Sequence, residues 1–389
     1  MDMSEDERLR DLMLAVEVPP TTADIGLAIA TGRRQAARRG TTLAGAAAAL
    51  ALAGGTAYAL GVTPSPGGSG GAPTGQQPQG APFAACTVDT VDVGVPTGIP
   101  VVDPAGRLIV ATAGGTAARL ADGAFTPYTS ATGQVVAVNA AGTVVGYDEV
   151  DEASHMLAWT YRDGTKTPLA KLTGYAYTVP TAVNARGDVA GYAMGEANDD
   201  SVPVVWPADR PGTVRALAVP AGYGEPGTSG SQAAGIGDDG TAVGNVRGAA
   251  TRWSPDGTPA LLPVPPGHDL TIATAMRGGH AYGLARVVGA DRNSALRWDL
   301  TAGTVTVLTG APDDITDGTP TGWAITTGGD YNQPTRIAPD GTVERLPLPP
   351  GLQLPPKGPG AVAASISDDG TTITGATATT DRHLLIWHC

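Results

Sequence analysis

The amino-acid sequence predicts an all-β fold, a seven-bladed β-propeller, over residues 86–389. Three observations predict it: a sequence unit occurs seven times, tryptophan recurs within that unit, and Asp-Gly turns separate short apolar stretches. The 389-residue chain is also turn-rich, with 55 glycines and 33 prolines, while 42% of its residues are hydrophobic. Many short strands around a packed core fit this composition.

The repeat is clearest in two segments, AVNAAGTVVGY at 137–147 and AVNARGDVAGY at 182–192, which agree at eight of eleven positions. Looser copies begin at Asp103, Gly235, Ala275, Ile325 and Ser365. The turn glycines of the seven units lie 36 to 53 residues apart, 44 on average, which is the length of one four-stranded propeller blade. These glycines are Gly106, Gly142, Gly187, Gly240, Gly279, Gly329 and Gly370.

Each unit has the order strand, Asn/Asp-Gly turn, strand, longer loop, strand ending in tryptophan, Asp-Gly turn and last strand. The glycine of the second turn permits the positive φ of a tight hairpin. The tryptophans of the third strand are Trp159, Trp206, Trp253, Trp298 and Trp387. In the sixth unit Ile337 replaces tryptophan and Trp323 lies elsewhere, so the regularity of this blade stays open.

This pattern resembles the bacterial extracellular repeats of the HAF type, AINxxGxVVG…AFxW…L, and more loosely the WD40-like propellers. The resemblance covers residues 98–389 and is most specific in the second, third and seventh units. It implies a propeller fold and export from the cytoplasm. It carries no catalytic residues to this chain.

The seventh unit ends at Cys389 and lacks a fourth strand. The segment CTVDTVDVGV, which starts at Cys86, alternates as a strand does and directly precedes the first unit. We therefore expect it to supply the missing strand and close the ring. Cys86 and Cys389 then lie at the two ends of the interrupted turn, and we predict a disulfide between them, which an oxidising compartment permits. Two free thiols are the alternative.

The amino-terminal part divides into a cytoplasmic segment with a short amphipathic helix (1–40), a transmembrane helix (41–62) and a flexible Gly/Pro/Ser linker (63–85). Residues 41–62 carry no charge and form about 33 Å of helix, which is enough to cross a bilayer. The preceding arginines place the amino terminus in the cytoplasm and the propeller outside. The alternative is a twin-arginine export signal that is cleaved near Ala59, so that the propeller is secreted.

The longer loops carry many acidic residues. If the first and third strands of every blade run in the same direction, both short turns of each blade lie on one rim of the propeller and the longer loops on the other. The predicted binding residues of the long-loop rim are Asp148, Glu149, Asp151, Glu152, Glu196, Asp199, Asp200, Glu225, Asp313, Asp314 and Asp317. We expect an unknown protein or envelope ligand to bind there, because variable loops on a rigid scaffold usually carry binding. A solvated acidic surface is the alternative.

The net charge of −13 places −12 after residue 62, so nucleic acid is a poor partner for the propeller. Nucleophile-elbow, P-loop and zincin motifs are absent, and the histidines recur at no repeat position. Calcium sites at 198–200 or 313–317 lack the spacing of a known calcium loop. We therefore expect a monomeric binding, scaffold or sensor module without metal or cofactor. The alternative is a hydrolase or lyase that acts on envelope or extracellular polymers.

Overall fold

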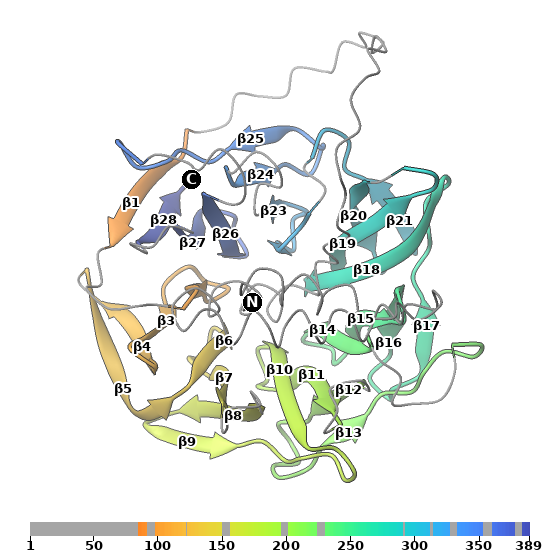
Figure 1. Cartoon of the computed structure of the whole chain (residues 1–389), viewed down its shortest axis with the longest axis horizontal. Helices are drawn as coiled ribbons and strands as arrows, with labels where there is room; N and C mark the ends of the chain where they lie inside the picture. The colour runs from red at the N-terminus through yellow and green to blue at the C-terminus, as the bar shows by residue number, and fades with distance from the viewer. Residues whose placement is uncertain are drawn as a thin grey trace, which may run out of the picture. The chain divides into compact units, whose positions relative to one another are not determined.

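The computed structural model describes residues 85–91, 98–121, 123–149, 156–195, 201–223, 230–290, 292–311, 314–326, 333–352, 360–377 and 383–389. These residues form seven four-stranded antiparallel sheets around a common axis (Figure 1). The predicted seven-bladed propeller is confirmed. The expected cytoplasmic segment 1–40, the transmembrane helix 41–62 and all of the linker except Ala85 lie outside the described residues. Within the described ranges, no helix has the length and apolar character that crossing a bilayer requires.

Blades 1 to 4 follow the chain in order, and the first strand of each faces the axis. Blade 1 consists of β2 (Val101–Val102), β3 (Ile109–Ala113), β4 (Thr116–Ala121) and β5 (Ala124–Thr132). Blade 2 consists of β6 (Gln134–Val138), β7 (Val144–Glu149), β8 (Met156–Arg162) and β9 (Thr165–Pro168). Blade 3 consists of β10 (Tyr177–Val183), β11 (Val189–Met194), β12 (Ser201–Trp206) and β13 (Arg215–Ala216). Blade 4 consists of β14 (Gln232–Ile236), β15 (Ala242–Val246), β16 (Ala249–Trp253) and β17 (Pro259–Leu261).

Blade 7 differs from the others because it joins the two ends of the described chain. Blade 5 consists of β18 (His268–Arg277), β19 (His280–Val287), β20 (Asn293–Asp299) and β21 (Thr304–Val307). Blade 6 consists of β22 (Asp317–Gly318), β23 (Ala324–Thr326), β24 (Thr335–Ile337) and β25 (Val343–Arg345). Blade 7 consists of β26 (Ala361–Ile366), β27 (Thr372–Thr377), β28 (Leu384–His388) and β1 (Thr87–Val91).

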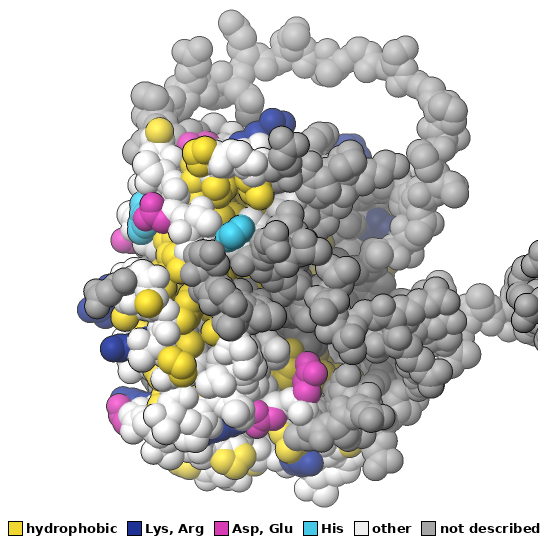
Figure 2. All heavy atoms as spheres, turned by 60° about the vertical axis from the view of Figure 1, so that its left-hand side comes forward, with side chains coloured by type: hydrophobic (Ala, Val, Ile, Leu, Met, Phe, Trp, Pro, Cys, Tyr) yellow, Lys and Arg dark blue, Asp and Glu magenta, His cyan; other side chains and the backbone are white. Residues whose placement is uncertain are grey.

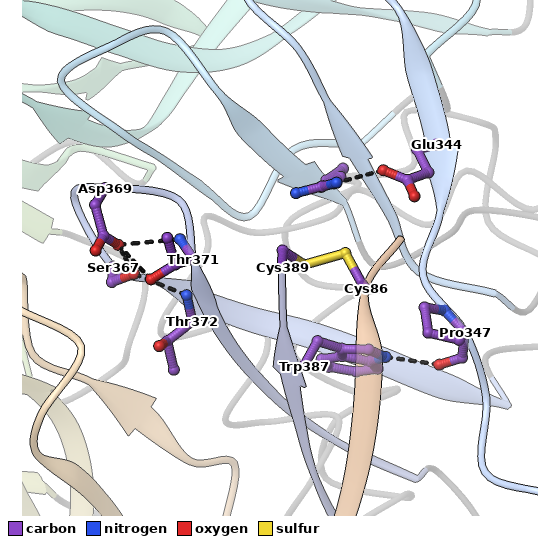
Figure 3. Close-up of a disulfide and its surroundings, with 10 residues drawn as sticks. Cys86, Glu344, Pro347, Ser367, Asp369, Thr371, Thr372, Trp387 and Cys389 are labelled. Carbon is purple, nitrogen blue, oxygen red and sulfur yellow. Dashed lines mark hydrogen bonds and ion pairs between the residues drawn. A yellow bond between two sulfur atoms is a disulfide. The ribbon is translucent and has the colours of Figure 1, made fainter. Parts of the chain in front are cut away.

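The ring closes as the sequence predicts. β1 pairs antiparallel with β28, from Thr87 opposite His388 to Val91 opposite Leu384. A disulfide joins Cys86 to Cys389, with their Cα atoms 4.1 Å apart (Figure 3). The N–H of Cys389 donates to the carbonyl of Thr371, directly after the first turn of blade 7. The disulfide therefore lies at the rim that carries the short turns of the blades, which we call the tight-turn rim.

Four tryptophans, in blades 3, 4, 5 and 7, each connect their own blade to the preceding one. In each case the indole N–H donates, over 2.7 to 2.8 Å, to a carbonyl that follows the fourth strand of the preceding blade. The pairs are Trp206 with Ala170, Trp253 with Ala218, Trp298 with Pro263 and Trp387 with Pro347, the last shown in Figure 3. The repeated tryptophan thus fills the core and also fixes one blade against the next.

Blade 2 departs from the predicted tryptophan pattern, whereas blade 6 has Ile337 in place of tryptophan as predicted. Trp206 pairs with Val189, at the start of the second strand, whereas the equivalent position of blade 2 holds Tyr161 opposite Val144. Trp159 lies two residues earlier, so its predicted position is wrong by two. In blade 6 the position is taken by Ile337, which is completely buried.

The first turn of blade 6 was also placed too late by the sequence pattern. That turn contains Gly322, with φ of +95°, whereas the predicted Gly329 lies beyond β23 and outside the described residues. Four strands nevertheless pair in the described part of this blade, so the sixth repeat forms a regular blade with short strands.

The glycine that recurs in the second strand has a steric reason. In blade 3, Gly191 pairs with Pro180, directly before a bulge at Thr181 in the first strand. A Cβ on Gly191 would overlap the carbonyl oxygen of Val179, so the two strands can approach this closely only with glycine. Four more described glycines share this arrangement: Gly146, Gly244, Gly283 and Gly375.

Candidate functional site

The first strands of the blades surround a central cavity of about 640 Å³, which we call the funnel. Residues of the tight turns line it, among them Pro104, Ala185 and Gly279, so its mouth lies at the tight-turn rim. The funnel lining includes one equivalent position of all seven first strands. Its occupants are Val101, Ala137, Ala182, Gly235, Ala275, Asp317 and Ser365. At this position the wall is therefore small and mostly apolar, and Asp317 is the one acidic residue.

Asp317 was predicted on the long-loop rim, and this placement is wrong. The residue lies in β22, is 8% exposed, and faces the funnel beside Arg277 of the blade 5 turn. The cause is the late assignment of the blade 6 turn, which made the first strand of this blade look like a loop.

An ionic cluster of three residues lies at the funnel mouth. Nη2 of Arg277 is 3.6 Å from Oδ2 of Asp317, and its Nη1 is 3.8 Å from Oδ1 of Asp368. The N–H groups of Gly318 and Ile366 also donate to Asp317, over 2.8 and 3.3 Å. Both ion pairs are long, so Arg277 neutralises each carboxylate only in part.

Carboxylates outnumber cations among the described residues that line the funnel. Four aspartates, Asp238, Asp239, Asp317 and Asp368, stand against Arg252 and Arg277. Burial raises the pKa of Asp368; Arg277 opposes this shift, while Asp317, Asp238 and Asp369 add to it. The funnel mouth thus has a net negative charge. The positive charge of Arg277 does not offset the effect of burial on the pKa of Asp368.

Hydrogen bonds between neighbouring blades hold the funnel wall. The hydroxyl of Thr181 donates to the carbonyl of Ala233 over 2.7 Å, and that of Thr274 to Ile315 over 3.0 Å. The asparagine of the repeat does the same at the turns, since Nδ2 of Asn139 donates to the carbonyl of Asn184 over 2.8 Å. These bonds fix the wall before any ligand enters.

Four of the predicted rim residues fall in the described part of the chain. Oδ2 of Asp148 lies 2.7 Å from Nζ of Lys166, which compensates its charge. Glu149 is exposed at the end of β7, Asp314 precedes β22, and Asp317 lies in the funnel. The remaining residues lie outside the described ranges: Asp151, Glu152, Glu196, Asp199, Asp200, Glu225 and Asp313. A binding role of the long-loop rim stays a prediction.

The outer side of the ring offers no concentrated charge in the view of Figure 2. There, on the described residues of the side that carries β1 and β5, acidic and basic side chains are scattered among apolar and polar ones. Across the described ranges, no three His, Cys, Asp or Glu side chains are grouped as metal ligands would be. The funnel therefore is the best-defined candidate site of the described molecule.

Sequence reasoning missed the funnel residues, although one signal was present. Two residues after the equivalent first-strand position, the first turn begins with Asp103, Asn139, Asn184, Gly237, Thr319 or Ser367 in six blades. In blade 5 it begins with Arg277. A single cation at a position whose side chain caps the turn in five other blades could have marked this cluster.

No protein-family model and no curated protein matches the sequence. Among solved structures, the chain is similar to virginiamycin B lyase from Staphylococcus aureus, with a TM-score of 0.51 and 16% identity over 78% of this chain and 99% of that one. It is also similar to the extracellular domain of a proposed one-component system from B. thetaiotaomicron (TM-score 0.51, 10% identity, 77% of this chain, 39% of that one). An oligogalacturonate lyase in complex with manganese is a third (0.51, 10%, 78% and 96%). These similarities show the propeller fold alone, and the resemblance to HAF-type repeats stays a prediction.

Proposed function

We propose that the protein is an extracytoplasmic binding module, held at the cell membrane by residues 41–62, that binds a small ligand with a cationic group in the funnel. The observation that carries this proposal is a cavity of about 640 Å³ with an apolar wall and an excess of carboxylates at its mouth. Its volume falls within the range of small-molecule sites. The apolar wall would contact the body of the ligand, and Asp317 and Asp368 its amino or guanidino group.

The position of the disulfide supports a small ligand. Cys86 lies at the tight-turn rim, so a linker that enters there comes from the side of the funnel mouth. If residues 63–85 are flexible, they span roughly 25 Å on average. Such a distance leaves room for a small molecule between propeller and membrane, and the helix expected within 1–40 could carry a signal to a cytoplasmic partner.

Binding is favoured over catalysis by the residues that line the funnel. None of the described lining residues is a histidine or a cysteine, and the hydroxyl of the one serine, Ser365, lies 3.4 Å from both the carbonyl oxygen of Val102 and Oδ2 of Asp317. The wall is instead rich in Ala, Val and Gly, which contribute shape and no acid–base chemistry. A hydrolase or lyase acting on envelope or extracellular polymers is the alternative, and turnover of such a polymer by the purified protein would reveal it.

Methionine methyl groups offer a test that distinguishes the two rims. Met276 lines the funnel, whereas Met194 ends β11 and Met156 begins β8, where both border long loops. With ¹³C-methyl methionine, we expect 2-phenylethylamine to shift the Met276 resonance saturably and to leave the other two unchanged. The neutral analogue 2-phenylethanol is expected to bind about tenfold more weakly, because it forms no charged hydrogen bond with a carboxylate.

The matched variant for this test is Asp317→Asn with Asp368→Asn, which keeps the shape of the mouth and removes two charges. This double variant should abolish the preference for the amine over the alcohol. The methyl spectrum of the free variant should remain that of a folded protein. Shifts at Met156 and Met194 without a change at Met276 would place the ligand at the long-loop rim and contradict the proposal.

The amine affinity is expected to depend on pH through Asp368. Its pKa is raised from the ordinary value of 3.8, chiefly by burial, so the proton leaves this carboxyl group at a higher pH than usual. The amine binds the ionised form; affinity should therefore be full above the raised pKa and fall as the pH decreases through it, while the probe stays protonated throughout. Titrations between pH 8 and pH 4 check this. In Asp368→Asn the decrease should move to lower pH; an unchanged profile would exclude Asp368 as its origin.

A further inference from the structure

A second cavity, of about 440 Å³, lies at the tight-turn rim between blades 3 and 4. We call it the seam groove. Its charged residues are three arginines and two aspartates: Arg186, Arg210, Arg215, Asp188 and Asp209. In contrast to the funnel, the seam groove thus carries a net positive charge.

The contacts between blades 4 and 5 and between blades 5 and 6, which we call the next two seams, explain why space remains here. In blades 4 and 5 the residue before the third-strand tryptophan is an arginine that reaches to the following blade. Nη1 of Arg252 donates to the carbonyl of Leu300 over 3.0 Å, and Arg297 donates to the carbonyls of Gly322 and Pro339 over 2.8 and 3.0 Å. In blade 3 the same position holds Val205, which lines the seam groove.

The cations of the seam groove differ in how far they are neutralised. Nε and Nη2 of Arg186 donate to Asp188, which also accepts from Asn184 and from the N–H of Ala208. Arg210 and Asp209 form a long, exposed pair at 3.5 Å.

Arg215 has no such partner in the described structure. It extends from β13 across the seam, where its Nη1 lies 3.2 Å from the point that a Cβ on Gly257 would occupy. Its Nε is buried and forms no hydrogen bond with any described residue. A guanidinium group stays charged at all physiological pH values, and leaving a buried donor of such a group unsatisfied is costly.

We propose that the seam groove binds a small oxyanion, a carboxylate or a phosphate, through the guanidinium group of Arg215. The planar fork of arginine matches two oxygens of either group, and Arg186, which also lines the groove, lies against Gly240. This site is independent of the funnel and of the ligand proposed there.

The test compares phosphate and acetate with chloride at matched ionic strength, on the full-length protein. We expect phosphate or acetate to raise the melting temperature and, for phosphate, to broaden the ³¹P resonance saturably. Arg215→Met keeps the aliphatic stem and should weaken this response about tenfold or more. Arg345→Met is the matched control, since Arg345 also lies on a fourth strand, β25, and is exposed. Which anion acts more strongly identifies the ligand class.

A second variant keeps the proposal testable if Arg215→Met unfolds. Val205→Arg places an arginine where Arg252 and Arg297 stand in the next seams, and it should fill the groove and abolish the anion response in a folded protein. An equal response in Arg215→Met and wild type, or an unchanged response in Val205→Arg, would overturn the proposal.

Discussion

Replacing Cys86 and Cys389 together by serine is expected to lower the free energy of unfolding by on the order of 5 kcal/mol. The disulfide joins residues separated by 303 positions, so in the unfolded chain it restricts nearly the whole propeller. It also holds β1 on β28, whose pairing closes the ring. Urea unfolding of the double variant, followed by tryptophan fluorescence, measures the loss.

Reduction provides the control for this prediction. A reductant should destabilise the wild-type protein by a similar amount and leave the double serine variant unchanged. If the variant unfolds at the same urea concentration as the oxidised wild type, the disulfide does not contribute to closure, and the backbone pairing of β1 with β28 suffices.

Gly191→Ala is expected to destabilise the protein by about 3 kcal/mol, an effect at the upper end of overpacking substitutions. The new methyl group would overlap the carbonyl oxygen of Val179 and press on the ring of Trp206, so β10 and β11 would have to separate. Backbone cannot move aside as a flexible side chain can. The free energy of unfolding in urea is again the measurement.

Gly303→Ala is the matched control, because it adds the same methyl group to another glycine of the propeller. A Cβ on Gly303 would meet nothing within 4 Å, and only its φ of +67° opposes alanine. We expect a loss of about 1 kcal/mol there. Equal losses at both positions would show that the close approach of the two strands is not what requires Gly191.

Closure and blade number could be predicted because local chemistry determines them. Asn139 and Gly142 form a tight turn whose φ value requires glycine, and the same turn recurs at Asn184 and Gly187. A seventh unit without a fourth strand then needs a partner, and the strand after Cys86 alternates correctly to provide one. Such features depend on residues close in sequence or on a simple count of strands.

The funnel could not be predicted because it depends on residues that meet only in the closed ring. Arg277, Asp317 and Asp368 come from three different blades, and the exceptional arginine at the turn position of blade 5 is the one sign of the cluster in the sequence. Blade 6 added a further difficulty: its strands are short and Ile337 replaces tryptophan, so Gly329 was mistaken for the turn and Asp317 for a loop residue. Acidic loops are conspicuous in a sequence, whereas a cavity lined by Ala, Val and Gly is not, so the sequence pattern favours the long-loop rim.

The proposed ligand site lies in the funnel at the tight-turn rim. The most direct measurement is a crystal structure of the protein with 2-phenylethylamine. We expect the amino group within hydrogen-bond distance of Asp317 or Asp368 and the phenyl ring against the apolar wall near Met276 and Val138. A probe bound among the acidic loops of the opposite rim, with the funnel empty, would contradict it.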